Sequence, residues 1–248
     1  MTDFESGVAT SKSGYRKIAF CHRRAVADGL SYFWTDKCCI DKRSSAELSE
    51  AINSMYRWYR ESDRCYVYLQ DVSGNSSDDC FAIAFCNSRW MTRGWTLQEL
   101  LAPFSVGFFS VEEKLLGNKD SLRDLLSRAM TIPVTALTSL TPTRFSRHER
   151  MRWVQRRKTK VEEDMVYCML GLFEVSLAVF YGEGRQNALV RLDEAISGWL
   201  KYSSMPTHGP YHLHNTSLNL SRSITVLTPI YRQRDQLSTV YASGRALV

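Results

Sequence analysis

The sequence predicts an α/β fold in which a parallel sheet is flanked by helices and followed by a helical C-terminal subdomain. Residues 14–109 alternate between helical and strand patterns, an order typical of parallel sheets. Beyond residue 120 only helical spacing recurs. The chain has 248 residues, of which 44% are hydrophobic, so it is long enough for one large or two small domains with buried cores.

The first predicted elements are a helix at 14–28 and a strand at 30–36. Apolar residues recur at helical spacing up to Val26, and Gly29 stands where a helix commonly ends. The run LSYFWTD that follows is rich in aromatic residues, which favour strands. We expect residues 36–42 to form a loop at the carboxyl end of this strand.

A capped helix is predicted to begin near Ser44. Ser44 and Glu47 have the spacing of a capping box, and apolar residues recur on one helical face up to Tyr59. The later pattern predicts strands at 65–69 and 106–109, and helices at 92–101, 121–130, 146–158, 162–172 and 186–200. We therefore divide the chain into an α/β core at 1–110, a helical continuation at 111–200 and a basic tail at 201–248 that we expect to be disordered.

Composition excludes several classes of protein. No apolar run approaches the roughly 20 residues that span a bilayer, and the N-terminus carries no apolar leader, so we expect a cytoplasmic protein without a membrane span. The seven cysteines are odd in number and contain no C-x-x-C pair, which indicates buried free thiols and no zinc ribbon. The basic run at 143–160 is followed at once by acids at 162–164, which indicates a solvated, salt-bridged surface, and no nucleic-acid-binding module is found.

Three segments carry a family resemblance. They are GLSYFWTDKCCIDKRSSAELSEAINSMYRWYRESDRCYVYLQDV at 29–72, SRWMTRGWTLQELLAP at 88–103 and EEDMVYCMLGLFEVSLAVFYGEG at 162–184. Together they closely resemble the fungal HET domain, the heterokaryon-incompatibility module, and with the helices between them the likeness extends over about residues 3–200. The resemblance implies a role in non-self recognition between fungal individuals and in the programmed cell death that follows fusion of incompatible hyphae.

The resemblance also implies that one strand is missing. HET domains usually open with a strand of the type YAILSHTW before a segment like TDFESGVATSKSGYRK at 2–17, and this chain begins after it. In a flavodoxin-like sheet the first strand is central, between the second and the third. Its absence would leave two strand edges unpaired. We therefore expect a truncated gene model or a degenerate paralogue, with low stability.

HET domains are in turn distantly similar to TIR domains, some of which cleave the nicotinamide–ribose bond of NAD. The run WTLQEL at 95–100 is similar to the W-C-x-x-E-L helix of those enzymes, which implies Glu99 as the catalytic carboxylate and NAD as a substrate, with no resident cofactor. A carboxylate would stabilise the oxocarbenium-like ribose, and Trp95, one helical turn earlier, would flank the base. The structural alternative places Trp95 in the core and makes Glu99 an exposed helical residue.

Arg93, Asp36 and Asp41 are the other candidate substrate-binding residues. Arg93 and the free N–H groups of its helix would hold a phosphate, or Arg93 pairs with a surface carboxylate. Asp36 and Asp41 follow a strand at the edge where open α/β sheets bind ligands, although Asp41 could instead order its loop through an Asx turn. Cys38 and Cys39 lie between them and are expected to be core thiols, since no histidine is near in sequence.

Two further motifs favour structural roles. His208, His212 and His214 have tolerable spacing for a metal but no fourth ligand, so we predict no metal site. The run YGEG at 181–184 predicts a tight turn that docks the last helix, because no Lys-Ser/Thr pair follows to form a phosphate loop.

Two functions of different classes remain after these arguments. The first is non-self recognition and cell-death signalling through association with protein partners or with further copies of the chain. The second is NAD glycohydrolysis through Glu99. The missing strand favours the first for this chain.

Overall fold

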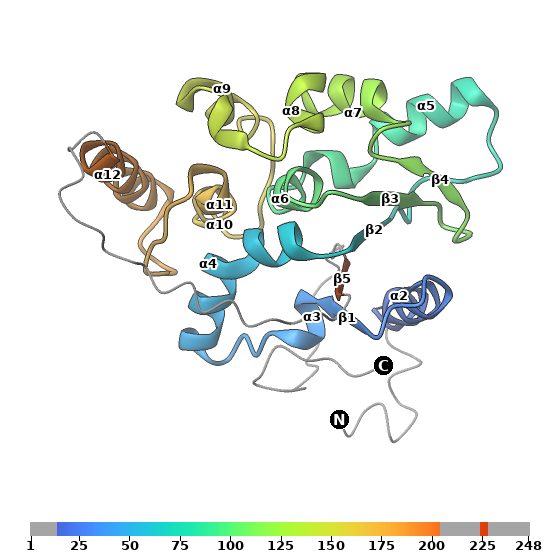
Figure 1. Ribbon diagram of the computed structural model, residues 1–248, viewed down its shortest axis with the longest axis horizontal. Helices are drawn as coiled ribbons and strands as arrows, with labels where there is room; N and C mark the ends of the chain where they lie inside the picture. Colours follow the sequence, from blue (N-terminus) through green and yellow to red (C-terminus); the bar gives the residue numbers. More distant parts are fainter. Residues whose placement is uncertain (1–13, 204–223, 228–248) are drawn as a thin grey trace.

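A mixed sheet of five strands lies at the centre of the fold (Figure 1). The computed structural model describes residues 14–203 and 224–227. The strands are β1 (Tyr32–Thr35), β2 (Arg64–Tyr68), β3 (Val106–Phe109), β4 (Leu115–Asn118) and β5 (Ile224–Leu227), in the spatial order β1-β5-β2-β3-β4. The first four strands in this order are parallel, and β4 pairs antiparallel with β3. The predicted α/β class is confirmed, while the sheet is mixed because of β4.

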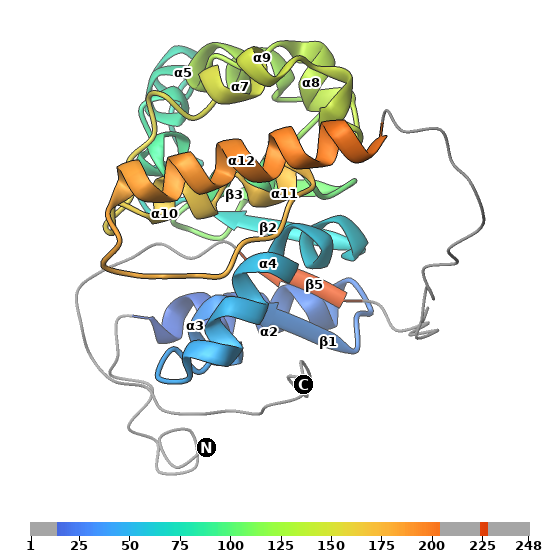
Figure 2. The ribbon, with the colours of Figure 1, turned by 90° about the vertical axis from the view of Figure 1, so that its left-hand side faces the viewer.

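Helices cover both faces of the sheet, with α2 on one face and α4 and α6 on the other (Figure 1). The helices are α2 (Tyr15–Ala27), α3 (Asp36–Cys39), α4 (Ser45–Glu61), α5 (Asp78–Cys86), α6 (Thr96–Leu101), α7 (Arg123–Met130), α8 (Val134–Thr138), α9 (Arg147–Arg152), α10 (Asp164–Tyr167), α11 (Leu170–Phe173) and α12 (Arg185–Ser203), with 3-10 turns η2 (Arg89–Thr92) and η3 (Pro142–Arg144). The long helix α12 packs against α10 on the outside of the helical part (Figure 2). No helix in the described part of the chain is long and apolar enough to cross a membrane.

The strand β5 fills the central position of the sheet. All four of its residues pair with β1, and three of them pair with Arg64–Tyr66 of β2. Its sequence, Ile-Thr-Val-Leu, has three β-branched residues, which suit a strand. The expectation of two unpaired central edges is therefore wrong, because residues 224–227 of the tail occupy the place that the resemblance assigns to a missing first strand. Residues 204–223 and 228–248, with the three tail histidines, lie outside the described residues.

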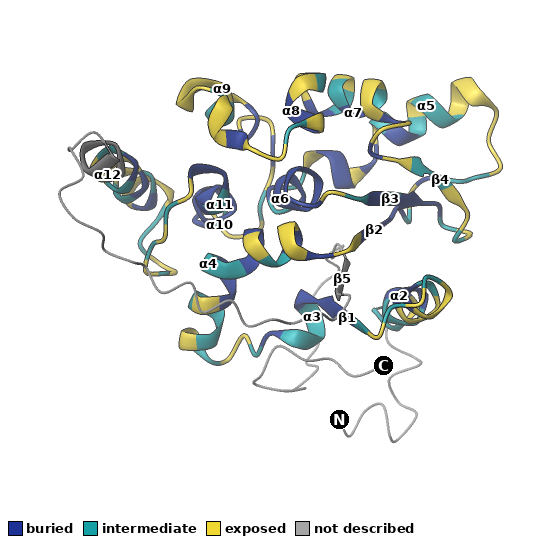
Figure 3. Cartoon of the chain, in the orientation of Figure 1, coloured by how far each residue is buried: buried dark blue, intermediate teal, exposed yellow. Residues whose placement is uncertain are grey.

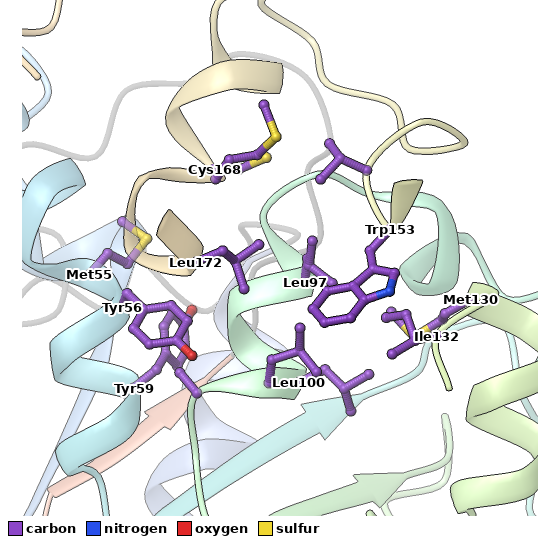
Figure 4. Close-up of a cluster of buried hydrophobic side chains, with 14 of the residues drawn as sticks. Met55, Tyr56, Tyr59, Leu97, Leu100, Met130, Ile132, Trp153, Cys168 and Leu172 are labelled. Carbon is purple, nitrogen blue, oxygen red and sulfur yellow. The ribbon is translucent and has the colours of Figure 1, made fainter. Parts of the chain in front are cut away.

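Alternate residues of the strands face two separate cores. Tyr66 and Tyr68 of β2 pack with Phe20 of α2 in the smaller core, whereas Cys65 and Val67 belong to the larger core on the other face. The buried residues of the larger core line the inner sides of α4, α6 and α11 (Figure 3). Figure 4 shows this packing where Tyr59 of α4 and Leu97 and Leu100 of α6 come together. The stripe predicted for α4 is buried at Ala51, Ile52, Met55 and Tyr59, whereas Val26, at the end of the stripe predicted for α2, is 55% exposed.

Local hydrogen bonds account for differences from the predicted elements. Residues 36–39 form the short helix α3 in place of a loop, because the Thr35 hydroxyl accepts a hydrogen bond from the Lys37 N–H. The Ser44 hydroxyl caps α4 by accepting from the Glu47 N–H at 3.3 Å. The Glu47 carboxylate accepts from the Asp41 N–H at 2.8 Å. Of the two hydrogen bonds of a capping box, only the one accepted by the Ser44 hydroxyl is therefore present.

The contact between α11 and α4 leads to a first stability prediction. A Cβ atom added at Gly171 of α11 would overlap the Cβ atom and ring of Tyr56 in α4. We expect Gly171→Ala to lower the free energy of unfolding by at least about 2 kcal/mol, measured by urea denaturation. Gly198→Ala in α12 is the matched control, because its Cβ atom would meet nothing within 4 Å and alanine favours helix by roughly 1 kcal/mol. Equal stability of the two variants would contradict the close packing of α11 on α4.

Candidate functional site

Several helix starts converge on the carboxyl ends of the parallel strands. The helices α2, α4 and α6 each lead into a strand, so each runs back along the sheet and begins at its carboxyl edge. The start of α2 also lies close to a side chain of α3, since a Cβ atom at Gly14 would lie 3.7 Å from Nζ of Lys37. Figure 2 shows α3 directly beyond the end of β1. We call the charged residues of this region the edge cluster: Lys17, Asp36, Lys37, Arg93 and Glu99.

Glu99 lies in the first turn of α6 and is 1% exposed. Its Oε2 atom accepts a hydrogen bond from Nε1 of Trp90 at 3.1 Å, and its carboxyl group is also hydrogen-bonded to the hydroxyl of Tyr59. Burial raises the pKa of Glu99 to about 8, against the opposing effect of the nearby Arg93 charge. Glu99 is therefore a buried and mostly protonated acid at neutral pH, and the alternative of an exposed helical glutamate is wrong.

Arg93 immediately precedes α6, and its backbone is fixed by neighbouring segments. Its carbonyl oxygen accepts from the Thr96 hydroxyl at 2.8 Å and from Nη1 of Arg157 at 2.7 Å. Residue 93 also forms a parallel bridge with Lys158, and the Gly94 N–H donates to the Lys158 carbonyl at 3.0 Å. The Arg93 charge acts on Glu99, Lys17 and Lys37, which places its side chain in the edge cluster.

Arg157 is a buried residue beside the candidate site that the sequence did not predict. It is 5% exposed and donates to the carbonyls of Trp153 and Arg93 and to the Thr96 hydroxyl. Burial lowers its pKa to about 10, so the guanidinium remains charged at neutral pH. The expectation that the basic run at 143–160 is wholly a solvated surface is therefore wrong, because Arg157 holds the turn from which α6 starts. In a run of basic residues such as 143–160, nothing in the sequence distinguishes the residue that becomes buried.

Asp36 is the first residue of α3, directly after β1, and is 7% exposed. Its Oδ2 atom pairs with Nζ of Lys42 at 3.4 Å. Its Oδ1 atom is buried and has no hydrogen-bond partner among the described residues. A buried carboxylate oxygen without a donor is unusual in folded proteins.

Lys17 also belongs to the edge cluster and was not among the predicted site residues. It lies in the first turns of α2 and is 6% exposed, and its Nζ atom has no hydrogen-bond partner within the described ranges. Burial, with the charges of Lys37 and Arg93, lowers its pKa to about 7. Its position at i−3 and i−4 from Phe20 and Cys21, on the apolar stripe of α2, is the signal that could have identified it.

Trp95 and Asp41 make contacts of their own outside the edge cluster. The Trp95 indole is hydrogen-bonded to the Asp164 carboxyl group and packs against the larger core, so it ties α6 to α10. Asp41 accepts from the N–H of Arg43 at 3.0 Å, as in an Asx turn, and from its guanidinium at 2.9 Å. These bonds lower the pKa of Asp41 to about 2. Of the five predicted site residues, the structure brings together Asp36, Arg93 and Glu99.

The cysteines and the YGEG turn have structural surroundings. All seven cysteines are free; Cys80 is exposed, contrary to the expectation of buried thiols, and no group of His, Cys, Asp and Glu in the described part could hold a metal ion. Gly182 and Gly184 have positive φ angles of 96° and 80°, and their N–H groups donate to Oε1 of Glu163 at 2.8 and 3.0 Å. The predicted tight turn before the last helix is confirmed.

Comparison with known proteins gives the family. The family described as "Heterokaryon incompatibility protein (HET)" matches residues 9–84. The "Vegetative incompatibility protein HET-E-1" of Podospora anserina is 50% identical over 198 residues, which is 78% of this chain and 15% of that protein. The chain carries a HET domain. No solved structure matches it.

The HET match covers part of the edge cluster. Residues 9–84 include α2, β1, α4 and β2, and therefore Lys17, Asp36 and Lys37. Arg93 and Glu99 follow after the end of that match. The chain spans 15% of the length of HET-E-1, so the match concerns this domain and leaves most of the relative without a counterpart.

Proposed function

We propose that this HET domain acts in vegetative incompatibility, as a module of fungal non-self recognition and cell-death signalling in the cytoplasm. The observation that carries the proposal is the 50% identity over 198 residues to HET-E-1, a protein named for vegetative incompatibility. The mechanism we propose is association with protein partners or with further copies of the chain. The domain would then act by presenting its folded surface, without chemistry.

The arrangement of the sheet supports a TIR-like or flavodoxin-like fold as part of this proposal. In the flavodoxin-like order 2-1-3-4-5, the central strand is flanked by the second and third strands. The observed order β1-β5-β2-β3 has the same form, with β5 in the central place. Domains with this fold that act by associating with other proteins would therefore be the structural precedent for this domain.

Inducible expression of the full chain in a filamentous fungus tests the signalling role. We expect colony survival to fall at least tenfold on induction, and two differently tagged copies to co-purify. The Gly171→Ala variant, which should fold poorly, is the control that separates a specific effect from the burden of expression. Undiminished survival together with no association would contradict the proposal.

NAD glycohydrolysis is the second candidate, favoured by the environment of Glu99. This acid has a pKa raised to about 8 and lies among Lys17, Asp36 and Arg93 at the edge where α/β proteins bind ligands. Its ionised form would stabilise an oxocarbenium-like ribose, and its protonated form would donate a hydrogen bond. Because Glu99 is 1% exposed, substrate would reach it only if the surrounding helices open.

Release of nicotinamide from NAD by the purified chain tests this second function. We expect Glu99→Gln to reduce release at least about 100-fold, since the amide keeps the shape and loses the charge. Asp41→Asn is the matched control, because its carboxylate is engaged by Arg43 outside the edge cluster, and it should keep wild-type activity. Equal activity of the Glu99→Gln protein would remove Glu99 from the mechanism.

A further inference from the structure

Two buried atoms of opposite charge in the edge cluster lack hydrogen-bond partners. They are Nζ of Lys17 and Oδ1 of Asp36, neither of which has a partner among the described residues. Both residues are more than nine-tenths buried. Leaving such groups unpaired lowers the stability of the folded protein, and more so when they are charged. The site therefore presents one donor and one acceptor that a ligand could satisfy together.

The start of α2 adds further donors at the same place. This 13-residue helix has Gly14 at its N-cap, with no side chain to accept from its free N–H groups, and no acidic residue in its first turn. Lys37 Nζ lies beside Gly14, 3.7 Å from where a Cβ atom would be. A helix N-terminus next to lysine side chains is a favourable place for an anion.

The charge balance of the edge cluster favours an anion as well. Its basic residues are Lys17, Lys37 and Arg93, of which Lys17 is about half protonated at pH 7 because its pKa is about 7, and its acids are Asp36 and Glu99. The pKa of Glu99, raised to about 8, leaves it mostly uncharged at neutral pH. The pKa values of Lys17 and Lys37 are lowered mainly by burial and also by neighbouring cations, a cost that a bound dianion would offset.

We infer that the edge cluster binds a small phosphate ester that carries a hydroxyl group, such as a sugar phosphate. Lys17, Lys37 and the first N–H groups of α2 hold the phosphate, with Arg93 on the α6 side. Asp36 accepts a hydrogen bond from the hydroxyl through Oδ1. The burial of Lys17 and Asp36 does not suit a flat membrane surface, and a small molecule reaches their buried atoms, like Glu99, when the edge opens. Binding of this kind goes beyond the association function and requires no hydrolysis.

Calorimetric titration of the full chain with three probes tests the site. The probes are ribose 5-phosphate, inorganic phosphate and ribose. We expect ribose 5-phosphate to bind at least tenfold more tightly than phosphate, and ribose not to bind. Absence of binding by ribose 5-phosphate at millimolar concentration, or equal binding of ribose, would overturn the inference.

Matched variants assign the contacts. Lys17→Met should weaken binding of ribose 5-phosphate at least tenfold, while Asp36→Ala should abolish the preference for the ester over phosphate. Arg60→Met removes one positive charge from the exposed end of α4, at the opposite edge of the sheet, and should change affinity less than twofold. If Lys17→Met does not melt cooperatively, Lys37→Met replaces it, with an expected loss of at least threefold. Wild-type affinity in the folded lysine variant, or an equal loss in Arg60→Met, would refute a specific phosphate site.

Discussion

A chain that ends at Ser203 is expected to be less stable than the full chain by at least about 3 kcal/mol, or roughly 10 °C in melting temperature. This truncation removes β5, which pairs with four residues of β1 and three residues of β2. The backbone groups on the facing edges of β1 and β2 would lose their partners, and unpaired buried backbone groups are costly. Thermal unfolding followed by circular dichroism measures the difference.

The matched control for this truncation is a chain that ends at Leu227. It keeps β5 and removes only residues 228–248, so it should melt within a few degrees of the full chain. If the chain ending at Ser203 melted at the same temperature as the chain ending at Leu227, β5 would make no contribution to the sheet. With both central edges paired by β5, the ground for expecting low stability of the full chain is also removed.

The strand β5 shows where prediction from sequence reaches its limit. The predicted strands that became β1, β2 and β3 stand next to helices with strong periodicity, so local pattern was sufficient. The four residues of β5 lie in a polar segment and are separated by more than 150 residues from both partner strands. Nothing local distinguishes such a run from a disordered tail, because its stability comes from its neighbours in space. The short helix α3 was missed for a related reason, since a single hydroxyl cap decides it.

Part of the candidate site was predicted from the sequence. Asp36 was found because it follows a strand at the carboxyl edge, Arg93 because it precedes the start of a helix, and Glu99 through the resemblance. Lys17 and Arg157 were missed because a lysine or arginine in a helix or a charged run is usually exposed, and only packing reveals the exception. The burial of charged side chains is thus the property of this site that cannot be predicted from local sequence patterns.

Replacement of Glu99 by glutamine is expected to change how stability depends on pH. The folded-state pKa of Glu99 is about 8, above its ordinary value of 4.5, so the folded protein binds more protons than the unfolded chain between pH 4.5 and 8. The wild-type free energy of unfolding should therefore fall as pH rises through this window. Glu99→Gln cannot ionise, and relative to wild type it should gain on the order of 4 kcal/mol between pH 5 and 8. Urea denaturation at a series of pH values measures the two curves.

A control for the loss of a carboxylate is Glu50→Gln, on the exposed side of α4. Its curve should run parallel to that of wild type. Parallel curves for Glu99→Gln and wild type between pH 5 and 8 would mean that Glu99 is not buried as a neutral acid. The glutamine oxygen can still accept from Nε1 of Trp90, so a change in slope would not arise from loss of that hydrogen bond.

The pH dependence of the free energy of unfolding is expected to have the opposite sign at higher pH, which provides an independent check on the edge cluster. Lys17 has a folded-state pKa of about 7, below its ordinary value of 10.5, so the folded protein binds fewer protons than the unfolded chain between pH 7 and 10.5. This group makes stability rise with pH in that window, and Lys17→Met should remove the rise. Wild type should therefore be least stable near pH 7–8, where the loss from Glu99 is nearly complete and the gain from Lys17 has begun. A double variant with both replacements should lose both the fall between pH 4.5 and 8 and the rise between pH 7 and 10.5 that these two groups cause, because neither position then titrates.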